Sequence, residues 1–343
     1  MLEPVFEAEI TPGMHADDAV RLGRAVEQAG FHRLGLSCVA LWQDTYQLQA
    51  LIAAATERIQ IGAMVTNPYT RHVSVHAAAL ATLQEVSKGR AFAGFGVGAG
   101  LEPFDINYPR PVSTLRETIT VLRALLNGDE VVYDGQHITV HGARLDRPPT
   151  VPVPIAIGTR SPRMMRLAGE LADRVLVGAR YLTPDLTATY RAWLAEGSAV
   201  AGREAKTIEM MARVTLCISD DGQLAINSVK RFAAHYLEIL GDAGPPIEAD
   251  RRDLILKSLR RAEGWYFDLN RYDPPEMLEL IDDELARAFA VVGTPAQCAE
   301  QIRAILDMGF AGVSCNLAAV NRESMYSGLS ESVTGAAKML TML

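Results

Sequence analysis

Ile59 to Gly100 reads IQIGAMVTNPYTRHVSVHAAALATLQEVSKGRAFAGFGVGAG. β-prone residues fill its two ends, Ile59 to Val65 and Ala91 to Val97, and apolar residues recur at helical spacing between them, from His72 to Val86. This order predicts a strand, a helix and a second strand. Each strand leads into a polar or glycine-rich loop rather than a tight turn, and such loops suit a bound ligand. The segment therefore predicts a cofactor site.

The same alternation of strands and helices continues along the whole chain. The eight expected strands are Val5 to Ile10, Leu34 to Ser37, Ile59 to Val65, Ala91 to Val97, Val153 to Ile157, Arg174 to Val177, Met210 to Ile218 and Ala311 to Leu317. Eight strand–helix units in 343 residues favour an α/β fold of the closed parallel kind, a (β/α)8 TIM barrel, over a doubly wound sheet. No linker interrupts the pattern, so we expect one domain over residues 1–343.

Two segments depart from this rhythm and are expected to be insertions. Residues 130–147 place Asp134-Gly135 between two alternating β-prone runs, which predicts a hairpin. Residues 241–283 contain two Pro-Pro pairs and an arginine-rich helical pattern, which predicts a helical insertion. We expect the second insertion to shape a substrate pocket or a subunit contact.

The composition limits what the chain can bind. Hydrophobic residues make up 49% and charged residues 22%, and the formal net charge is −8 with a pI near 5.5. This balance argues against nucleic acid as a partner. No window approaches the roughly 18 apolar residues of a membrane span, and the first ten residues, MLEPVFEAEI, lack the basic start of a signal peptide. Four scattered cysteines without a CxxC pair predict reduced thiols, and cytoplasmic residence is expected.

The glycines of GFGVGAG, Gly94 to Gly100, fit the loose pattern of a dinucleotide-binding motif. That motif must open directly into a helix, and three prolines between positions 103 and 111 prevent this. The sequence therefore predicts a glycine-lined loop at the end of a strand instead. The backbone of such a loop can approach a planar ring or an anion closely.

A second candidate for ligand binding is Gly158-Thr159-Arg160, which follows the fifth strand. Ser161 is a typical N-cap and Pro162 a typical first helical residue, so free amides and the helix dipole converge beside Thr159 and Arg160. This arrangement predicts a phosphate site. A well-capped helix with solvated arginines is an equally simple interpretation.

Candidate proton donors and metal ligands are few. Glu9 ends the first strand, where its carboxylate would project into the mouth of a barrel, either as a general acid or as the ion-pair partner of an arginine. His72 and His76 lie four residues apart without a third ligand, so we expect no metal site. The chain contains neither a GxSxG elbow nor a GxxxxGK phosphate loop.

The sequence resembles the luciferase-like flavin- and deazaflavin-dependent oxidoreductases. The resemblance rests on GAMVTNPYTRH from Gly62 to His72, on ALATLQEVSKGR and GVGAG after it, and on two later segments, PVPIAIGTRSPRMMRLAGELADRVLVG and AFAVVGTPAQCAEQIRAILDMGFAGV. It is strongest towards the methylenetetrahydromethanopterin reductase branch and spans nearly the whole chain. It implies a bacterial luciferase-like barrel whose cofactor lies in the mouth, with the ring against a bulge at the third strand. That bulge would contain a non-prolyl cis peptide between Met64 and Val65.

The resemblance also implies roles for particular residues. The implied set is Cys38, Met64, Val65, Thr66 and Asn67 around the ring, Gly98, Ala99 and Gly100 beside the cofactor tail, Gly158, Thr159 and Arg160 at its phosphate, and Glu9 as the proton donor. Two positions depart from the family pattern. Cys38-Val39 stands where an Asp-His pair is usual, and Leu101 precedes Glu102 where the reductase has an aspartate. Glu102 is therefore the second candidate for the proton donor.

These observations predict a coenzyme F420-dependent oxidoreductase that moves hydride between the deazaflavin and a small to medium organic substrate. Small residues in the loop after the fourth strand favour F420, because FMN-binding relatives often carry an arginine there. One alternative is an FMN-dependent monooxygenase that uses reduced flavin and oxygen. The other is a barrel without catalysis that serves as a binding or structural subunit. The resemblance also implies a homodimer, and no membrane partner is expected.

Overall fold

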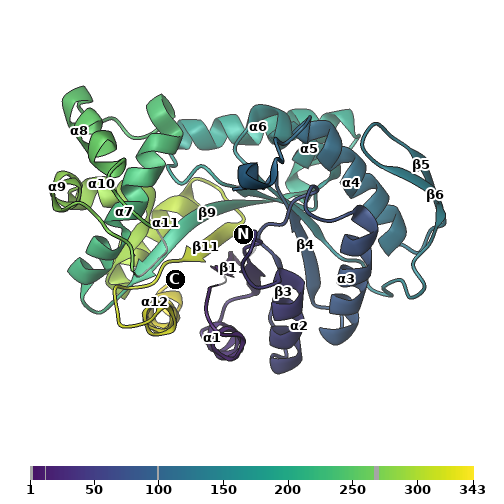
Figure 1. Cartoon of the computed structure of the whole chain (residues 1–343), viewed down its shortest axis with the longest axis horizontal. Helices are drawn as coiled ribbons and strands as arrows, with labels where there is room; N and C mark the ends of the chain where they lie inside the picture. The colour runs from purple at the N-terminus through teal and green to yellow at the C-terminus, as the bar shows by residue number, and fades with distance from the viewer. Residues whose placement is uncertain (1–2, 12, 99, 266–269) are drawn as a thin grey trace.

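The computed structural model describes residues 3–11, 13–98, 100–265 and 270–343. Within these ranges, eight parallel strands close into a barrel (Figure 1). In order around the ring they are β1 (Val5–Ile10), β2 (Arg33–Leu36), β3 (Gln60–Ala63), β4 (Ala91–Phe95), β7 (Ile155–Thr159), β8 (Arg174–Val177), β9 (Glu209–Ile218) and β11 (Gly312–Leu317). The ring is closed because β9 pairs with both β8 and β11, and β11 pairs with β1. The predicted (β/α)8 TIM barrel is confirmed.

Helices alternate with these strands and surround them (Figure 1). They are α1 (Ala16–Gln28), α2 (Thr45–Ala55), α3 (Val73–Val86), α4 (Pro111–Leu126), α5 (Pro162–Leu171), α6 (Pro184–Val200), α7 (Gly222–Leu240), α11 (Pro295–Asp307) and α12 (Met325–Leu340). Side-chain caps define where several of them begin. Ser161 accepts a hydrogen bond from the Met164 amide at the start of α5, and Thr183 caps α6 in the same way.

Large apolar side chains fill the inside of the barrel. The fully buried ones that pack together are Met64, Phe92, Ala156, Leu176 and Met211. Two glycines make room for them. A Cβ atom at Gly35 would lie 2.2 Å from Cγ of Met64, and one at Gly62 would lie 2.5 Å from the Phe92 ring. The interior is therefore a packed layer rather than a pore.

Charged side chains close the end of the barrel at which the strands begin. Glu7 is fully buried, and one of its oxygens lies 3.0 Å from Nη1 of Arg33 and 3.2 Å from Nη1 of Arg174. Arg33 also pairs with Glu209 at 2.8 Å. Buried charges are tolerated when they are paired in this way. The opposite end of the barrel, where the strands finish, is left for a binding site.

The two segments expected to be insertions form elements outside the ring of eight barrel strands. The hairpin consists of β5 (Val131–Asp134) and β6 (Thr139–Ala143), which form a separate two-stranded antiparallel sheet. The helical insertion contributes α8 (Ala249–Leu259) and α9 (Pro275–Leu280), which lie beside α7 in Figure 1.

Two neighbouring elements were not predicted from the sequence: the helix α10 (Asp283–Phe289) and the strand β10 (Val291–Gly293), which pairs with the end of β9. Three residues are too few to show an alternating pattern. Across the described ranges, no helix is long and apolar enough to cross a membrane.

Candidate active site

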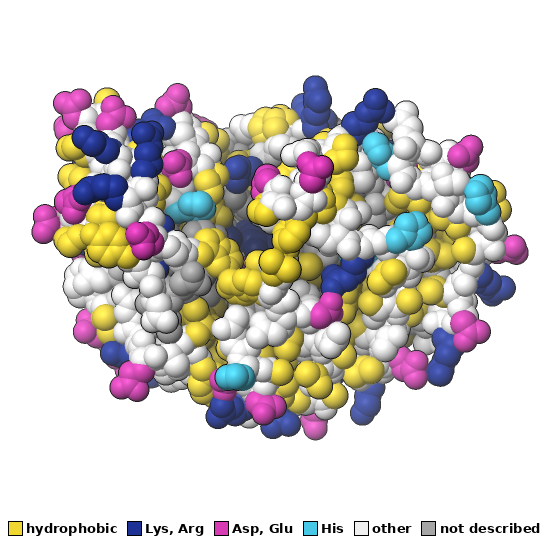
Figure 2. All heavy atoms as spheres, viewed as in Figure 1, with side chains coloured by type: hydrophobic (Ala, Val, Ile, Leu, Met, Phe, Trp, Pro, Cys, Tyr) yellow, Lys and Arg dark blue, Asp and Glu magenta, His cyan; other side chains and the backbone are white. Residues whose placement is uncertain are grey.

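A cavity of about 1910 Å³ lies where the barrel strands end. Each barrel strand, or the residue that directly follows it, contributes to the wall, through Glu9, Ser37, Met64, Gly96, Gly158, Leu176, Arg213 and Asn316. Helix α7 and Trp265 add a further side. Figure 2 shows the molecule hollowed in this region, with basic side chains inside. The C-terminal mouth of such a barrel is where TIM-barrel enzymes place their active sites.

The bulge after β3 forms part of this wall. The peptide bond between Met64 and Val65 is cis, which confirms the conformation that the resemblance implied. Met64 is buried, whereas Val65 is partly exposed to the cavity. A Cβ atom at Gly96 would lie 2.7 Å from Val65, and one at Gly158 would lie 3.0 Å from it. The two glycines therefore leave room for the Val65 side chain and keep the surface around it open.

Glu9 and Arg213 form an ion pair beside the bulge. Nη2 of Arg213 lies 2.6 Å from one oxygen of Glu9 and 2.5 Å from the other, and it also donates to the Met64 carbonyl at 3.2 Å. Ser37 donates to Glu9 at 2.5 Å. Glu9 is fully buried, so its carboxylate faces a guanidinium rather than solvent. This geometry matches the second role that the sequence left open for Glu9, that of an ion-pair partner.

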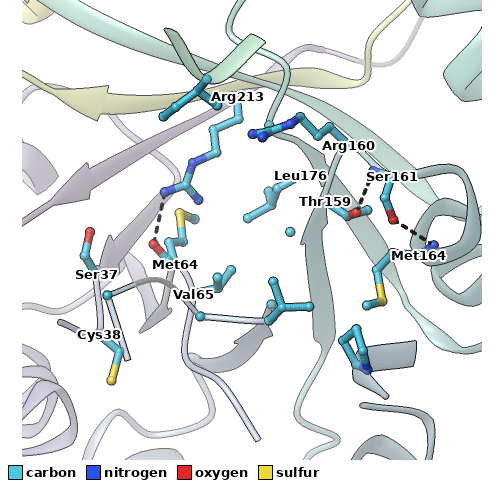
Figure 3. Close-up of a pocket in the computed structure, with 18 of the residues that line it drawn as sticks. Ser37, Cys38, Met64, Val65, Thr159, Arg160, Ser161, Met164, Leu176 and Arg213 are labelled. Atoms are coloured by element: carbon cyan, nitrogen blue, oxygen red, sulfur yellow. Dashed lines mark hydrogen bonds between the residues drawn. The ribbon is translucent and has the colours of Figure 1, made fainter. Parts of the chain in front are cut away.

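The phosphate site predicted after β7 has the expected local structure. Ser161 caps α5, and its own amide donates to the Thr159 hydroxyl at 3.0 Å. Arg160 is exposed, lines the cavity and points from β7 towards Arg213 in Figure 3. No hydrogen bond or ion pair joins Arg160 to another residue that the structure describes. Its guanidinium is therefore available to an anion.

Positive charge dominates the cavity wall. Among the described residues that line it, one carboxylate, that of Glu9, faces seven arginines, namely Arg110, Arg116, Arg160, Arg163, Arg166, Arg180 and Arg213. Some of these arginines bind acidic partners outside the cavity, such as Arg116, which pairs with Glu170 at 2.5 Å. Since the whole chain carries a net charge of −8, this concentration of arginine favours an anionic ligand.

Of the other residues predicted from the sequence, some line the cavity and some do not. Cys38, Gly98, Gly100, Gly158 and Thr159 line the cavity, as do the bulge residues. Ala99 lies outside the described residues.

Three predicted residues do not line the cavity. Thr66 and Asn67 are buried behind the bulge, and the Asn67 side chain accepts hydrogen bonds from the amides of Tyr69 and Thr70, both at 2.9 Å. Glu102 is exposed on a short 3-10 helix, Glu102–Phe104. The functional roles predicted for these residues stay predictions.

Several wall residues were not predicted from the sequence. Asn316 is 5% exposed, and its side-chain oxygen has no hydrogen-bond partner among the described residues. Trp265 also lines the cavity and packs edge-to-face against Trp42, with ring centres 4.9 Å apart. His235 and Tyr236 come from α7. These side chains lie far apart in sequence. Arg213, which was also missed, has one sequence signal: it is the only charged residue in the predicted strand from Met210 to Ile218.

The fold and the cavity define the class as TIM-barrel proteins with an arginine-rich cavity where the strands end. The chain belongs to the luciferase-like monooxygenase family, whose model matches residues 2–312. It is 29% identical over 306 residues to a 5,10-methylenetetrahydromethanopterin reductase of Methanolobus tindarius, which covers 89% of this chain and 91% of the relative. The resemblance inferred from the sequence is therefore confirmed.

Two further comparisons agree. An F420-dependent glucose-6-phosphate dehydrogenase of Beutenbergia cavernae is 30% identical over 271 residues, covering 74% of this chain and 80% of the relative. The solved structure of the coenzyme F420 dependent tetrahydromethanopterin reductase from Methanopyrus kandleri matches with a TM-score of 0.82 at 23% identity. That match covers 97% of this chain and 98% of the other, so the two proteins share the fold over nearly their whole length.

Proposed function

We propose that this protein is a coenzyme F420-dependent oxidoreductase that transfers hydride between the deazaflavin and a small to medium organic substrate. The observation that carries the proposal is the arginine-rich cavity at the barrel mouth, built around the Met64-Val65 bulge. Two relatives that share much of this sequence carry names of F420-linked or pterin-linked reactions.

The residues of the cavity fit such a cofactor. A planar ring can rest on Val65, because Gly96 and Gly158 carry no side chains that would cover it. The unpartnered oxygen of Asn316 can accept a hydrogen bond from a ring N–H group, which would satisfy a buried acceptor. Arg160, beside the start of α5, can hold the phosphate of the tail.

When bound, F420 supplies the hydride chemistry, and the protein contributes orientation and charge. In this arrangement, Met64 and Val65 would brace the ring, and Gly98 and Gly100 would pass beside the tail. Arg213 fixes the Met64 carbonyl and is itself fixed by Glu9. The sequence predicts Glu9 or Glu102 as the proton donor, but the ion pair of Glu9 with Arg213 and the exposed position of Glu102 outside the described cavity wall make both less suited to that role. Unchanged turnover of a Glu9→Gln variant at saturating cofactor would rule out a donor role for Glu9.

A binding experiment tests the choice of cofactor. Purified protein is titrated with F420 and, separately, with FMN, while quenching of the intrinsic fluorescence is followed. Two of the three tryptophans line the cavity, so a ligand there should quench the signal strongly. We expect saturable binding of F420 that is tighter than binding of FMN. Tight binding of FMN without a response to F420 would instead support a monooxygenase, and binding of neither would support a barrel without catalysis.

The proposed assembly and location of the protein follow from the family resemblance and the cysteine pattern. We expect a homodimer that works in the cytoplasm on a small-molecule substrate. In agreement with a reducing compartment, Cys38, Cys217, Cys298 and Cys315 are free thiols in the structure. Light scattering of the purified protein would measure the oligomeric state directly, and a monomeric mass would contradict the expected dimer.

A further inference from the structure

Helix α7 supplies the cavity with a tyrosine that lies among arginines. Tyr236 lines the cavity and is half-buried. The guanidinium carbon of Arg180, which follows β8, lies 5.6 Å from the centre of the Tyr236 ring, so a positive charge lies close to the phenol.

Two more positive charges act on the same hydroxyl. Burial alone would raise the pKa of Tyr236, but the charge and hydrogen bond of Arg180 and the charges of Arg213 and Arg160 outweigh burial, so the pKa lies below the ordinary value of a tyrosine. The neighbouring His235 also lines the cavity, and burial lowers its pKa, which keeps its ring neutral at pH 7. The cavity thus stabilises the anionic form of the phenol.

Arg213 connects Tyr236 with the bulge. The guanidinium that acts on the Tyr236 hydroxyl also donates to the Met64 carbonyl at 3.2 Å (Figure 3). Tyr236 and Val65 line the same cavity, and the charge of Arg213 acts at both places.

The other acidic groups near the cavity are less suited to exchange a proton with a substrate. Both oxygens of Glu9 lie within 2.6 Å of Nη2 of Arg213, and the side chain is fully buried. Glu102 is exposed and outside the described wall of the cavity. Tyr236 combines access to the cavity with neighbours that stabilise its charged form.

We propose that Tyr236 is the catalytic residue that exchanges a proton with a substrate oxygen while hydride moves, and that Arg180 positions it. The inference rests on the proposed function, and its new part is the role of Tyr236; the step is written for a substrate that carries a hydroxyl or carbonyl group. In oxidation, the substrate C–H bond breaks and its electron pair leaves with hydride to the deazaflavin. The hydroxyl proton passes to the phenolate of Tyr236, and the carbonyl bond forms. In reduction, the phenol returns the proton to the oxygen.

The first test needs neither cofactor nor substrate. The ultraviolet absorbance of phenolate is followed during a pH titration of the wild-type protein, Tyr236→Phe and Tyr190→Phe. Tyr190 is a matched control, since it lies on a helix, is buried outside the cavity wall and has its pKa raised by burial. We expect one of the ten tyrosines to ionise at lower pH than the rest in the wild type and in Tyr190→Phe, and this transition to be missing in Tyr236→Phe. An unchanged titration in Tyr236→Phe would overturn the proposal.

The second test measures turnover with 2-propanol, cyclohexanol and glucose 6-phosphate as hydride donors, and with the corresponding carbonyl compounds in reverse. Tyr236→Phe should lower kcat by about 100-fold or more, because general acid–base catalysis contributes rates of this order. F420 binding by the variant should be unchanged, and Tyr190→Phe should turn over normally.

The remaining outcomes separate the claims. Full turnover by Tyr236→Phe would overturn the catalytic role. Wild-type protein that binds F420 but converts none of these compounds would overturn the alcohol–carbonyl class. Wild-type protein that does not bind F420 would overturn the proposed function, while the titration would still decide whether Tyr236 is the acidic tyrosine.

Discussion

Glu9 and Arg213 depend on each other at the base of the cavity. Glu9 is fully buried, and the Arg213 side chain is 14% exposed, so removing one charge leaves the other poorly solvated. We expect Glu9→Gln and Arg213→Gln each to lower the free energy of unfolding by about 3 kcal/mol. The double variant should lose less than the sum of the two. Urea unfolding of the four proteins measures this coupling, and strictly additive losses would contradict it.

Arg160 should contribute to cofactor binding without contributing to the fold. It is exposed, and no described residue binds its guanidinium. Arg160→Ala should therefore weaken F420 binding about tenfold, since a hydrogen bond to a charged group contributes roughly 1.5–3 kcal/mol. The urea unfolding curve should not change. Arg144→Ala, an exposed arginine on the hairpin insertion, is the control and should bind normally. Equal affinity of both variants would exclude Arg160 from the site.

At the scale of elements, α3 holds the turn that follows β3. His76 on α3 is fully buried, with Nε2 3.1 Å from the Asn67 carbonyl and Nδ1 2.9 Å from the Tyr46 hydroxyl. The first contact requires Nε2–H as donor, so Nδ1 accepts from Tyr46. Burial, assisted by the charge of Arg71, lowers the pKa of His76 to about 4. This neutral histidine joins the helix to the segment behind the bulge.

The lowered pKa of His76 predicts a pH dependence of stability. The unfolded chain binds a proton at this histidine near pH 6.5, whereas the folded protein does so only near pH 4. The contribution of His76 to the free energy of unfolding is therefore complete above pH 6.5 and is lost as the pH falls towards 4. Lowering the pH from 7 to 5 should therefore reduce the free energy of unfolding by about 2 kcal/mol through this histidine. His76→Gln lacks the titration, so the stability difference between wild type and variant should shrink over that range. A constant difference would contradict the prediction.

Elements with strong local signals could be predicted, and those that depend on closure of the barrel could not. Helix α5 and strand β8 have the bounds that the sequence indicated, because a cap and a continuous apolar run define them. Asn67 was expected at the ring because it follows the bulge, but its side chain binds the next turn instead. Tyr236 and Asn316 meet in one cavity only after α7 and β11 have packed. No local sequence pattern predicts that these two residues line the same cavity.

At the scale of the whole molecule, charge is separated between the surface and the cavity. The chain carries −8 overall, yet arginines far outnumber the one carboxylate among the described residues of the cavity wall. An acidic exterior repels anions in general, whereas a recessed basic cavity attracts one that fits. Electrostatic attraction of this kind supports both the affinity for an anionic cofactor and the exclusion of nucleic acid.

This separation predicts that salt will weaken binding of the charged cofactor in particular. Raising NaCl from about 50 mM to about 500 mM shortens the screening length from roughly 14 Å to about 4 Å. We expect the Kd for F420 to rise several-fold over this range, as measured by fluorescence quenching. The matched control is the deazaflavin without phosphate and tail, which carries the same ring but lacks the charges of the tail. Its affinity should change little, since it interacts with Val65 and the glycines rather than with the arginines. An equal salt dependence of the two ligands would show that the arginines do not attract the tail.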